Sequence, residues 1–231
     1  MRSVAIIGRG RAGGSLAAAL GATGRWDAVL LGRDEAPAAG VELVVVATPD
    51  AAVADVAAAL APDAGRVVAH LSGALGPEPL VDHPRWAVVH PLVSMPDADL
   101  GAARLAGGAW FGVAGDPIGR ELVADLGGHA VDVPDGSWAR YHAAAAIASN
   151  HLVGLLGQVE RVAPVPLAAY LGLARGSLDN VAALGPAAAL TGPVARGDWD
   201  TVERHLASLP ADERAAYQAG VDLCVRLLRG S

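Results

Sequence analysis

A glycine-rich turn near the start of the chain restricts the possible fold more than any other feature. The sequence "SVAIIGRGRAGGSLAAALGATG" places a short apolar β-type run, residues 4–7, before the turn and an Ala/Leu run with helical periodicity after it. A G-x-G-x-x-G motif between a strand and a helix is typical of dinucleotide binding. The first glycine permits the tight turn, the second lets a pyrophosphate approach the backbone, and the third lets the helix pack closely on the strand. The helix N-terminus would direct free N–H groups at the phosphates. We therefore expect cofactor contacts from Gly8, Arg9, Gly10, Arg11, Ala12 and Gly13.

The end of the second predicted strand, "AVLLGRD", indicates which dinucleotide is bound. An acidic residue at this position would accept a hydrogen bond from the ribose 2′-hydroxyl, whereas an arginine would pair with a 2′-phosphate. Arg33 precedes Asp34 here, and a guanidinium can bind a phosphate with two N–H groups. The sequence therefore predicts NADP, in its reduced form NADPH, with Arg9 and Arg11 adding positive charge nearby. The alternative is that Arg33 is a solvated surface charge.

The rest of the first half alternates strand patterns with helix patterns. Residues 41–47 form a continuous apolar run, and further strands are predicted in "GRVVAHLSGALG", "WAVVHPLVSM", "GAWFGVAGD" and "GGHAVDVP". This alternation indicates an open, mostly parallel sheet. Ligands bind at the carboxyl ends of the strands in such sheets. We expect Thr48, Pro49 and Ser72 to contact the cofactor there, with His70 and His90 at the same rim.

The pattern changes after Pro134, and no strand pattern returns. Helices are predicted at about 139–163, 166–185, 186–190, 198–208 and 211–229. The chain is thus expected to be an α/β protein with two domains. An N-terminal Rossmann-type domain with a mostly parallel sheet occupies 1–134, and an all-α domain for substrate binding and dimerisation occupies 135–231.

The helical half carries a cluster of polar residues among alanines. At 100° per residue, Ser149 lies about 20° from His142 on the first helix, and Asn150 about 80° from it. In "LTGPVARGD", a Gly-Pro break separates Thr191 from Arg196. An arginine in an apolar-walled pocket suits a small carboxylate.

These polar residues suggest catalytic roles. His142 is the candidate proton donor because imidazole titrates near neutral pH, with His70 and His90 as rivals. Ser149, Asn150 and Thr191 would donate hydrogen bonds, and Arg196 would pair with the carboxylate. The alternative is that these are core polar groups bonded to backbone. Asp198 is the expected N-cap of the next helix, or it orients Arg196.

Composition excludes several other classes of function. The net charge is −7 with no basic cluster, which argues against nucleic acid or an anionic membrane as a partner. All 17 basic residues are arginine, so no lysine Schiff base can form. The single cysteine, Cys224, excludes an intramolecular disulfide and a cysteine-rich metal site, and we predict no metal. The apolar run before the first turn is too short for a signal peptide, and we expect a cytoplasmic protein without membrane spans.

The runs "HLSGALG", "HPLVSMPDAD", "YHAAAAIASN" and "LTGPVARGD" resemble a bacterial family over nearly the whole chain. Its members join a Rossmann-like domain to a helical domain of unknown function. The family is similar in build to the 6-phosphogluconate dehydrogenase-like reductases, including pyrroline-5-carboxylate reductase and ketopantoate reductase. The resemblance implies a reductase, with ketopantoate as the leading substrate. One departure is that many 3-hydroxyacid dehydrogenases and ketopantoate reductases have a lysine four residues before the asparagine, where this chain has Ala146.

The sequence therefore predicts an NADPH-dependent reductase of a small 2-oxo acid, converting ketopantoate (2-dehydropantoate) to pantoate in pantothenate biosynthesis. One alternative is an imine reductase of the pyrroline-5-carboxylate type, because a protonated imine needs no strong acid. Another is a non-catalytic NADP(H)-binding protein. Related reductases bury apolar helix faces in dimers, so a homodimer is expected.

Overall fold

The first part of the chain folds around one seven-stranded sheet. The computed structural model describes residues 1–230. The strand order is β2-β1-β3-β4-β5-β6-β7. The strands are β1 (Arg2–Ile7), β2 (Trp26–Leu31), β3 (Leu43–Val46), β4 (Val67–His70), β5 (Trp86–Pro91), β6 (Trp110–Gly115) and β7 (His129–Asp132). All neighbours pair in parallel except β5 and β6, which are antiparallel. The predicted α/β class with a mostly parallel sheet is confirmed.

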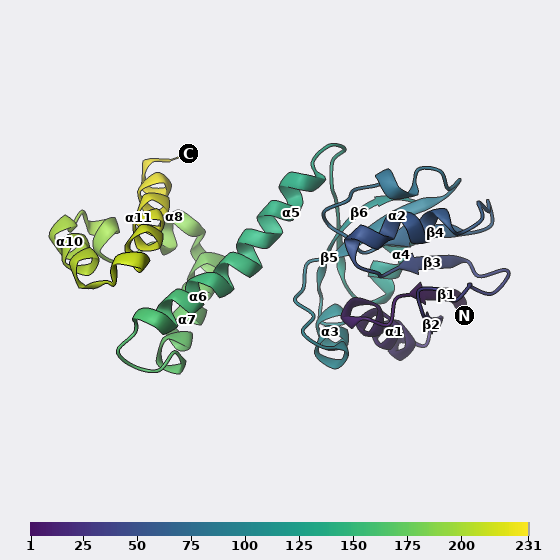
Figure 1. Ribbon diagram of the computed structural model, residues 1–231, viewed down its shortest axis with the longest axis horizontal. Coiled ribbons are helices and arrows are strands. Elements are labelled where there is room, and N and C mark those ends of the chain that lie inside the picture. The colour runs from purple at the N-terminus through teal and green to yellow at the C-terminus, as the bar shows by residue number, and fades with distance from the viewer. Residues whose placement is uncertain (231) are drawn as a thin grey trace. The chain divides into compact units, whose positions relative to one another are not determined.

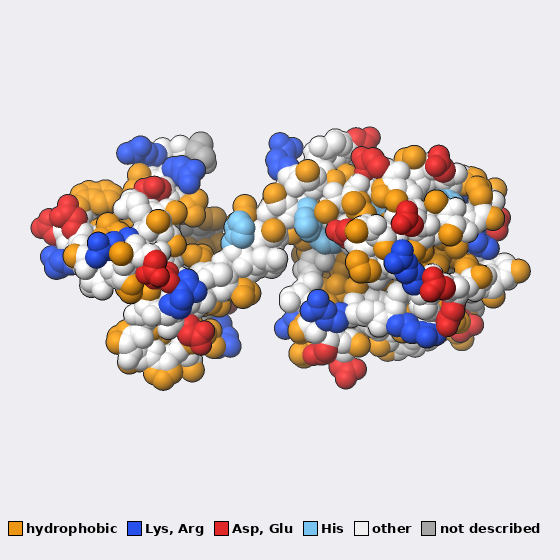
Figure 2. All heavy atoms as spheres, in the orientation of Figure 1, with side chains coloured by type: hydrophobic (Ala, Val, Ile, Leu, Met, Phe, Trp, Pro, Cys, Tyr) orange, Lys and Arg blue, Asp and Glu red, His pale blue; other side chains and the backbone are white. Residues whose placement is uncertain are grey.

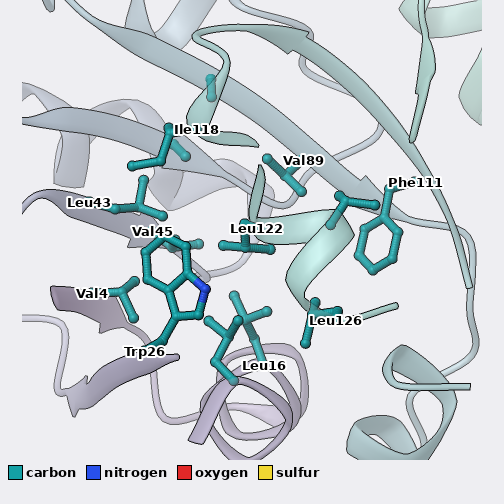
Figure 3. Close-up of a cluster of buried hydrophobic side chains, with 14 of the residues drawn as sticks. Val4, Leu16, Trp26, Leu43, Val45, Val89, Phe111, Ile118, Leu122 and Leu126 are labelled. Carbon is teal, nitrogen blue, oxygen red and sulfur yellow. The ribbon is translucent and has the colours of Figure 1, made fainter. Parts of the chain in front are cut away.

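Helices cover both faces of this sheet (Figure 1). Side chains of α1 (Arg11–Thr23), α3 (Ala98–Leu105) and α4 (Ile118–Asp125) pack in one apolar cluster with Val4, Ile6 and Val45. Figure 3 shows part of this cluster, in which Leu122 of α4 lies among strand residues. Side chains of α2 (Asp50–Ala58) and the 3₁₀ turn η1 (Glu78–Leu80) pack on the opposite face. Burial on both faces explains why the central strands are continuous apolar runs.

The remainder of the chain is helical. The helices are α5 (Trp138–Ala146), the π-helix η2 (Ile147–His151), α6 (Leu152–Val162), α7 (Ala168–Leu184), α8 (Pro186–Ala189), α9 (Pro193–Arg196), α10 (Trp199–Ser208), the 3₁₀ turn η3 (Ala211–Glu213) and α11 (Arg214–Arg229). The predicted helix ranges agree closely with these. The sequence pattern did not show the π-helix, nor the short α9 inside "LTGPVARGD".

The chain divides into two compact units, Met1–Ser149 and Asn150–Ser231. The sheet ends just before the predicted domain boundary at 134/135. The division between the units comes later because α5 packs on the sheet, where Trp138 and Tyr141 form a cluster with Val88 and Val133. The first unit therefore contains α5 as well as the complete sheet.

The second unit has a small core. Among its described residues only Val202, Glu213 and Val221 are buried, whereas Leu173 and Val153 are 71% and 69% exposed. Figure 2 shows apolar side chains at the surface over the connection between α6 and α7. Polar contacts link α6 to η3. Arg161 forms an ion pair with Glu213, and the backbone oxygen of Glu213 accepts a 3.0 Å hydrogen bond from Gln158.

No helix within residues 1–230 is long and apolar enough to cross a membrane. The same residues contain no group of three or more His, Cys, Asp or Glu side chains placed to hold a metal ion.

Candidate functional site

The glycine-rich turn connects β1 to α1 and has the geometry that the motif predicts. Gly8 has a φ of +128°, and a Cβ there would lie 2.6 Å from the carbonyl oxygen of Ala47. A Cβ on Gly13 would lie 1.9 Å from the oxygen of Gly8, so only glycine allows this close approach of α1 to the turn. A Cβ on Gly10, by contrast, would meet no atom within 4 Å. The backbone beside Gly10 is therefore open to a ligand.

The start of α1 lies in this opening. Gly10 is the N-cap and supplies no side-chain hydrogen bond to the helix. Arg11 is exposed and Ala12 is half-buried in the first turn. Backbone N–H groups at such a helix start can bind an anion.

Arg9 and Arg33, two of the three arginines that were predicted to contact the cofactor, have different surroundings. Arg9 donates 2.9 Å hydrogen bonds to both carboxylate oxygens of Glu35, which also accepts from the backbone N–H of Gly32. Arg33 is exposed and forms no ion pair among residues 1–230. It lines a cavity of about 430 Å³ between the end of β2 and α2, together with Ile7, Asp34, Glu35, Ala36, Pro37, Asp55, Val56, Ala59 and Leu60.

The turn after β3 contains an unsatisfied hydroxyl. The Oγ1 of Thr48 is buried and has no hydrogen-bond partner among the described residues. Pro49 is exposed and is the N-cap of α2. A buried hydroxyl without a partner is uncommon and indicates a place for a polar ligand atom.

The loop after β4 forms hydrogen bonds with His70, the last residue of that strand. His70 is fully buried, and its Nε2 lies 2.7 Å from the backbone oxygen of Gly76. Its Nδ1 accepts a 3.1 Å hydrogen bond from the backbone N–H of Ser72, whose Oγ accepts from Ala74. Burial lowers the pKa of His70. Both ring nitrogens are occupied within the protein, so the expectation of His70 as a rival proton donor is wrong, because it is a structural residue of this loop.

The end of β5 carries a second histidine with a different environment. The Nδ1 of His90 lies 2.8 Å from the phenol oxygen of Tyr141, and the two rings pack edge to face at 5.4 Å. Burial lowers the pKa of His90 to about 4, and the nearby His142 acts in the same direction. His90 is therefore neutral at pH 7.

His142 is the third member of this cluster. Its ring centroid lies 6.0 Å from that of His90, at an interplanar angle of 76°, and the side chain is half-buried. His90 and His142 are thus brought together from β5 and α5 within the first unit. Tyr141 belongs to the same cluster. No sequence pattern points to a role for it, because its contact with His90 spans 51 positions.

Ser149 and Asn150 do not lie in a regular α-helix. Residues Ile147–His151 form a π-helix, in which each residue turns through less than the 100° of an α-helix. The angles that were calculated from α-helical periodicity are therefore wrong for Ser149 and Asn150. The hydroxyl of Ser149 donates to the backbone oxygen of Ala145 at 2.8 Å.

The "LTGPVARGD" stretch lies in the second unit. Gly192 has a φ of +95°, and Pro193 begins the short helix α9, which ends at Arg196. Asp198 is the N-cap of α10 and accepts from the backbone N–H of Thr201 at 3.2 Å, so that prediction is confirmed. Thr191 lines a mostly apolar cavity of about 320 Å³ with residues of α6 and α11, whereas Arg196 is exposed.

Comparison with known proteins extends these observations. Residues 111–222 match the family model described as "Domain of unknown function (DUF2520)". No curated protein matches the chain.

Several solved structures share the fold. Protein TM1727 from Thermotoga maritima is 25% identical with a TM-score of 0.78, and the match covers 98% of each chain. BF3122 from Bacteroides fragilis, a proposed NADP oxidoreductase, is 18% identical with a TM-score of 0.76, covering 98% of this chain and 97% of that one. A reductive aminase from Aspergillus terreus, solved with NADPH and ethyl levulinate, is 18% identical with a TM-score of 0.69, covering 100% and 95%. These similarities establish a Rossmann-like sheet followed by a helical part.

Proposed function

We propose that this protein is an NADPH-dependent reductase of a small 2-oxo acid, with ketopantoate as the leading substrate. The proposal depends on one observation: the candidate cofactor and catalytic residues lie together at one edge of the sheet. The open glycine turn follows β1, the unpartnered Thr48 hydroxyl follows β3, and His90 is the last residue but one of β5, beside His142. The carboxyl ends of parallel strands meet at that edge, where α/β proteins bind their ligands.

The residues at this edge fit NADPH. The space beside Gly10 and the uncapped start of α1 suit a pyrophosphate, and Arg33 suits a 2′-phosphate. The buried Thr48 hydroxyl lacks a partner that a polar cofactor atom would supply. The structures of BF3122 and of the reductive aminase, which share this fold, are described with NADP or NADPH in their names. When bound, NADPH supplies a hydride.

Two histidines, His90 and His142, have different roles in the proton transfer that accompanies reduction. Reduction of a carbonyl leaves a negative oxygen that needs a proton, and a half-buried imidazole can give one near neutral pH. His90 is neutral at that pH, so it adds no positive charge beside His142. We therefore assign the role of acid to His142, whose half-buried ring lies beside that of His90. The substrate contacts of Ser149, Asn150, Thr191 and Arg196 stay predictions.

The test is NADPH oxidation by the purified protein with ketopantoate, compared with other 2-oxo acids. His142→Ala should lower kcat by roughly 10²–10⁴-fold, as loss of a general acid does, while the Kd for NADPH stays unchanged. His129→Ala, which removes an exposed histidine on β7, is the matched control and should keep full activity. NADPH binding without turnover on any substrate would refute the reductase proposal and favour a non-catalytic NADP(H)-binding protein.

Imine reduction is the second candidate. It is favoured by the absence of lysine from the whole chain, since a protonated imine already carries the proton that a ketone must receive. It is also supported by the similarity to a reductive aminase, because joining an amine to a carbonyl reductively proceeds through an imine. Turnover of pyrroline-5-carboxylate but not ketopantoate in the same assay would select this candidate.

We also propose that the second unit pairs with a second copy of the chain. Leu173, Leu184 and Leu223 are each more than half exposed in a unit that buries few apolar side chains. Exposed apolar surface of this kind usually marks an interface. Light scattering should give the mass of a dimer, about twice 23.1 kDa; the mass of one chain would contradict this proposal.

A further inference from the structure

The hydrogen bond between His90 and Tyr141 has no role in the function described so far. We propose that Tyr141 is a positioning residue: its O–H donates to the Nδ1 of His90, holding that ring as the neutral Nε2–H tautomer beside His142. The proton transferred to substrate is then carried by His142 alone. The part of this inference that concerns catalysis rests on the proposed function, whereas the part that concerns the tautomer does not.

The direction of the hydrogen bond follows from the chemistry of the two groups. A neutral phenol O–H is a stronger donor than a neutral imidazole N–H, and an imidazole nitrogen without hydrogen is a good acceptor. The phenol hydrogen therefore lies between the Tyr141 oxygen and the Nδ1 of His90, which are 2.8 Å apart. Burial raises the pKa of Tyr141 to about 12, so this hydrogen is retained at neutral pH. An imidazole nitrogen that accepts a hydrogen bond must be unprotonated.

Two glycines make room for the pair. A Cβ on Gly112 would lie 2.4 Å from the phenol oxygen, and a Cβ on Gly73 would lie 2.7 Å from the Nε2 of His90. Trp138 packs edge to face on Tyr141 at 5.5 Å. The pair is therefore packed between β6, the loop after β4 and α5.

The neutral state of His90 matters because of its neighbours. The titratable groups that act on it are His142, Asp50 and His70, with Tyr141 in direct contact. His70 is itself bonded in a neutral form, and only Asp50 would favour a charged His90. A positive charge on His90 would oppose a positive charge on His142, since the ring centroids are 6.0 Å apart. Tyr141 lowers this competition by stabilising neutral His90.

The tautomer can be measured by NMR on the full chain with ¹⁵N-labelled histidine, using His90→Gln to assign the signal. We expect an unprotonated Nδ1 and a protonated Nε2 on His90 from pH 8 down to about pH 5. Tyr141→Phe keeps the ring but removes the donor. It should raise the titration midpoint of His90 by roughly half to one pH unit, the equivalent of one ordinary hydrogen bond. A protonated Nδ1 in the wild-type chain, or an unchanged midpoint in Tyr141→Phe, would overturn the proposal.

The chain contains a matched control pair. The Nδ1 of His205 lies 2.8 Å from the phenol oxygen of Tyr217, with the rings edge to face at 5.9 Å, but this pair is exposed in the second unit. Tyr217→Phe should change the His205 signal and leave that of His90 unchanged. The wild-type tautomer decides the proposal even if Tyr141→Phe does not fold.

Kinetics test the catalytic part. Tyr141→Phe should lower kcat by about 10-fold, as loss of a group that orients a functional imidazole does, with the KM for NADPH unchanged. The acid limb of the kcat profile should also shift relative to wild type. Tyr170→Phe, on α7, removes a phenol oxygen elsewhere and should leave kcat unchanged. A wild-type protein without turnover would refute the proposed function, whereas full kcat in an active enzyme carrying Tyr141→Phe would refute the positioning role.

Discussion

The stability of this protein should fall as the pH drops from 7.5 to 5, and His90 should cause much of the fall. Burial lowers the pKa of His90 to about 4 in the folded chain, whereas an unfolded histidine titrates near 6.5. Between these values the unfolded chain binds a proton that the folded chain does not. Stability therefore rises with pH across this window, and the full contribution is present above about pH 6.5.

The size of the effect follows from the two pKa values. Each pH unit between them changes the free energy of unfolding by about 1.4 kcal/mol. From pH 7.5 to pH 5 the linkage integrates to about 2 kcal/mol for His90 alone. His70, whose pKa is also lowered by burial, acts in the same direction. Carboxylates titrate mostly below this range and so contribute little to the difference.

The assay is urea unfolding of wild type and His90→Gln at several pH values and one protein concentration. Glutamine does not titrate, so the variant should lose about 2 kcal/mol less stability than wild type between pH 7.5 and 5. Only the slopes are compared, because the substitution also changes the stability at every pH. The exposed His129→Gln serves as the control and should keep the wild-type slope. Equal slopes for wild type and His90→Gln would refute the argument that burial keeps His90 neutral.

Three further predictions follow from the same structure. Gly8→Ala should lower the midpoint of thermal unfolding, because its φ of +128° and the Ala47 oxygen at 2.6 Å exclude a side chain; Gly10→Ala should unfold like wild type yet weaken NADPH binding in a fluorescence titration. Equal NADPH affinity in Gly10→Ala would contradict the phosphate assignment. Arg33→Ser should raise the Kd for NADPH by roughly 10–100-fold, since hydrogen bonds to a charged group contribute about 1.5–3 kcal/mol, and should leave the Kd for NADH unchanged. Glu213→Gln should destabilise the protein at pH 7 but much less near pH 3. Its bond to Arg161 lowers the pKa of Glu213, so the stabilisation is present above an unfolded pKa near 4.3 and is lost as the pH falls through the folded value. An equal loss of urea midpoint at both pH values would contradict that account.

Local patterns predicted most of the fold. The glycine motif predicted the β1–turn–α1 unit. The positive φ at Gly8 and the close contact at Gly13 both require glycine, and the sequence has glycine at both positions. The strand and helix ranges followed from the hydrophobic pattern. Strands buried on both faces are continuous apolar runs, whereas helices buried on one face have apolar residues at helical spacing. The N-cap role of Asp198 was equally local, since a carboxylate reaches the N–H three residues on.

The candidate site was less predictable. The sequence placed His70 and His90 at the same rim but could not distinguish them, because the difference lies in bonding partners. The backbone of Gly76 occupies the Nε2 of His70, whereas Tyr141 reaches the Nδ1 of His90 from another element. The π-helix at Ile147–His151 was also missed, and it changed the angular positions calculated for Ser149 and Asn150.

The sequence by itself determined the Rossmann-type class, the glycine turn and the change to helices, because each depends on residues that are near neighbours in the chain. Only the tertiary structure decided the roles of the histidines: His70 is structural, His90 is held neutral, and His142 lies beside His90 on α5. Those properties arise from burial and from hydrogen bonds between residues that are far apart in sequence, such as His90 and Tyr141. The protonation of a side chain depends on the groups that surround it in space, and the hydrophobic periodicity of the sequence does not identify those groups.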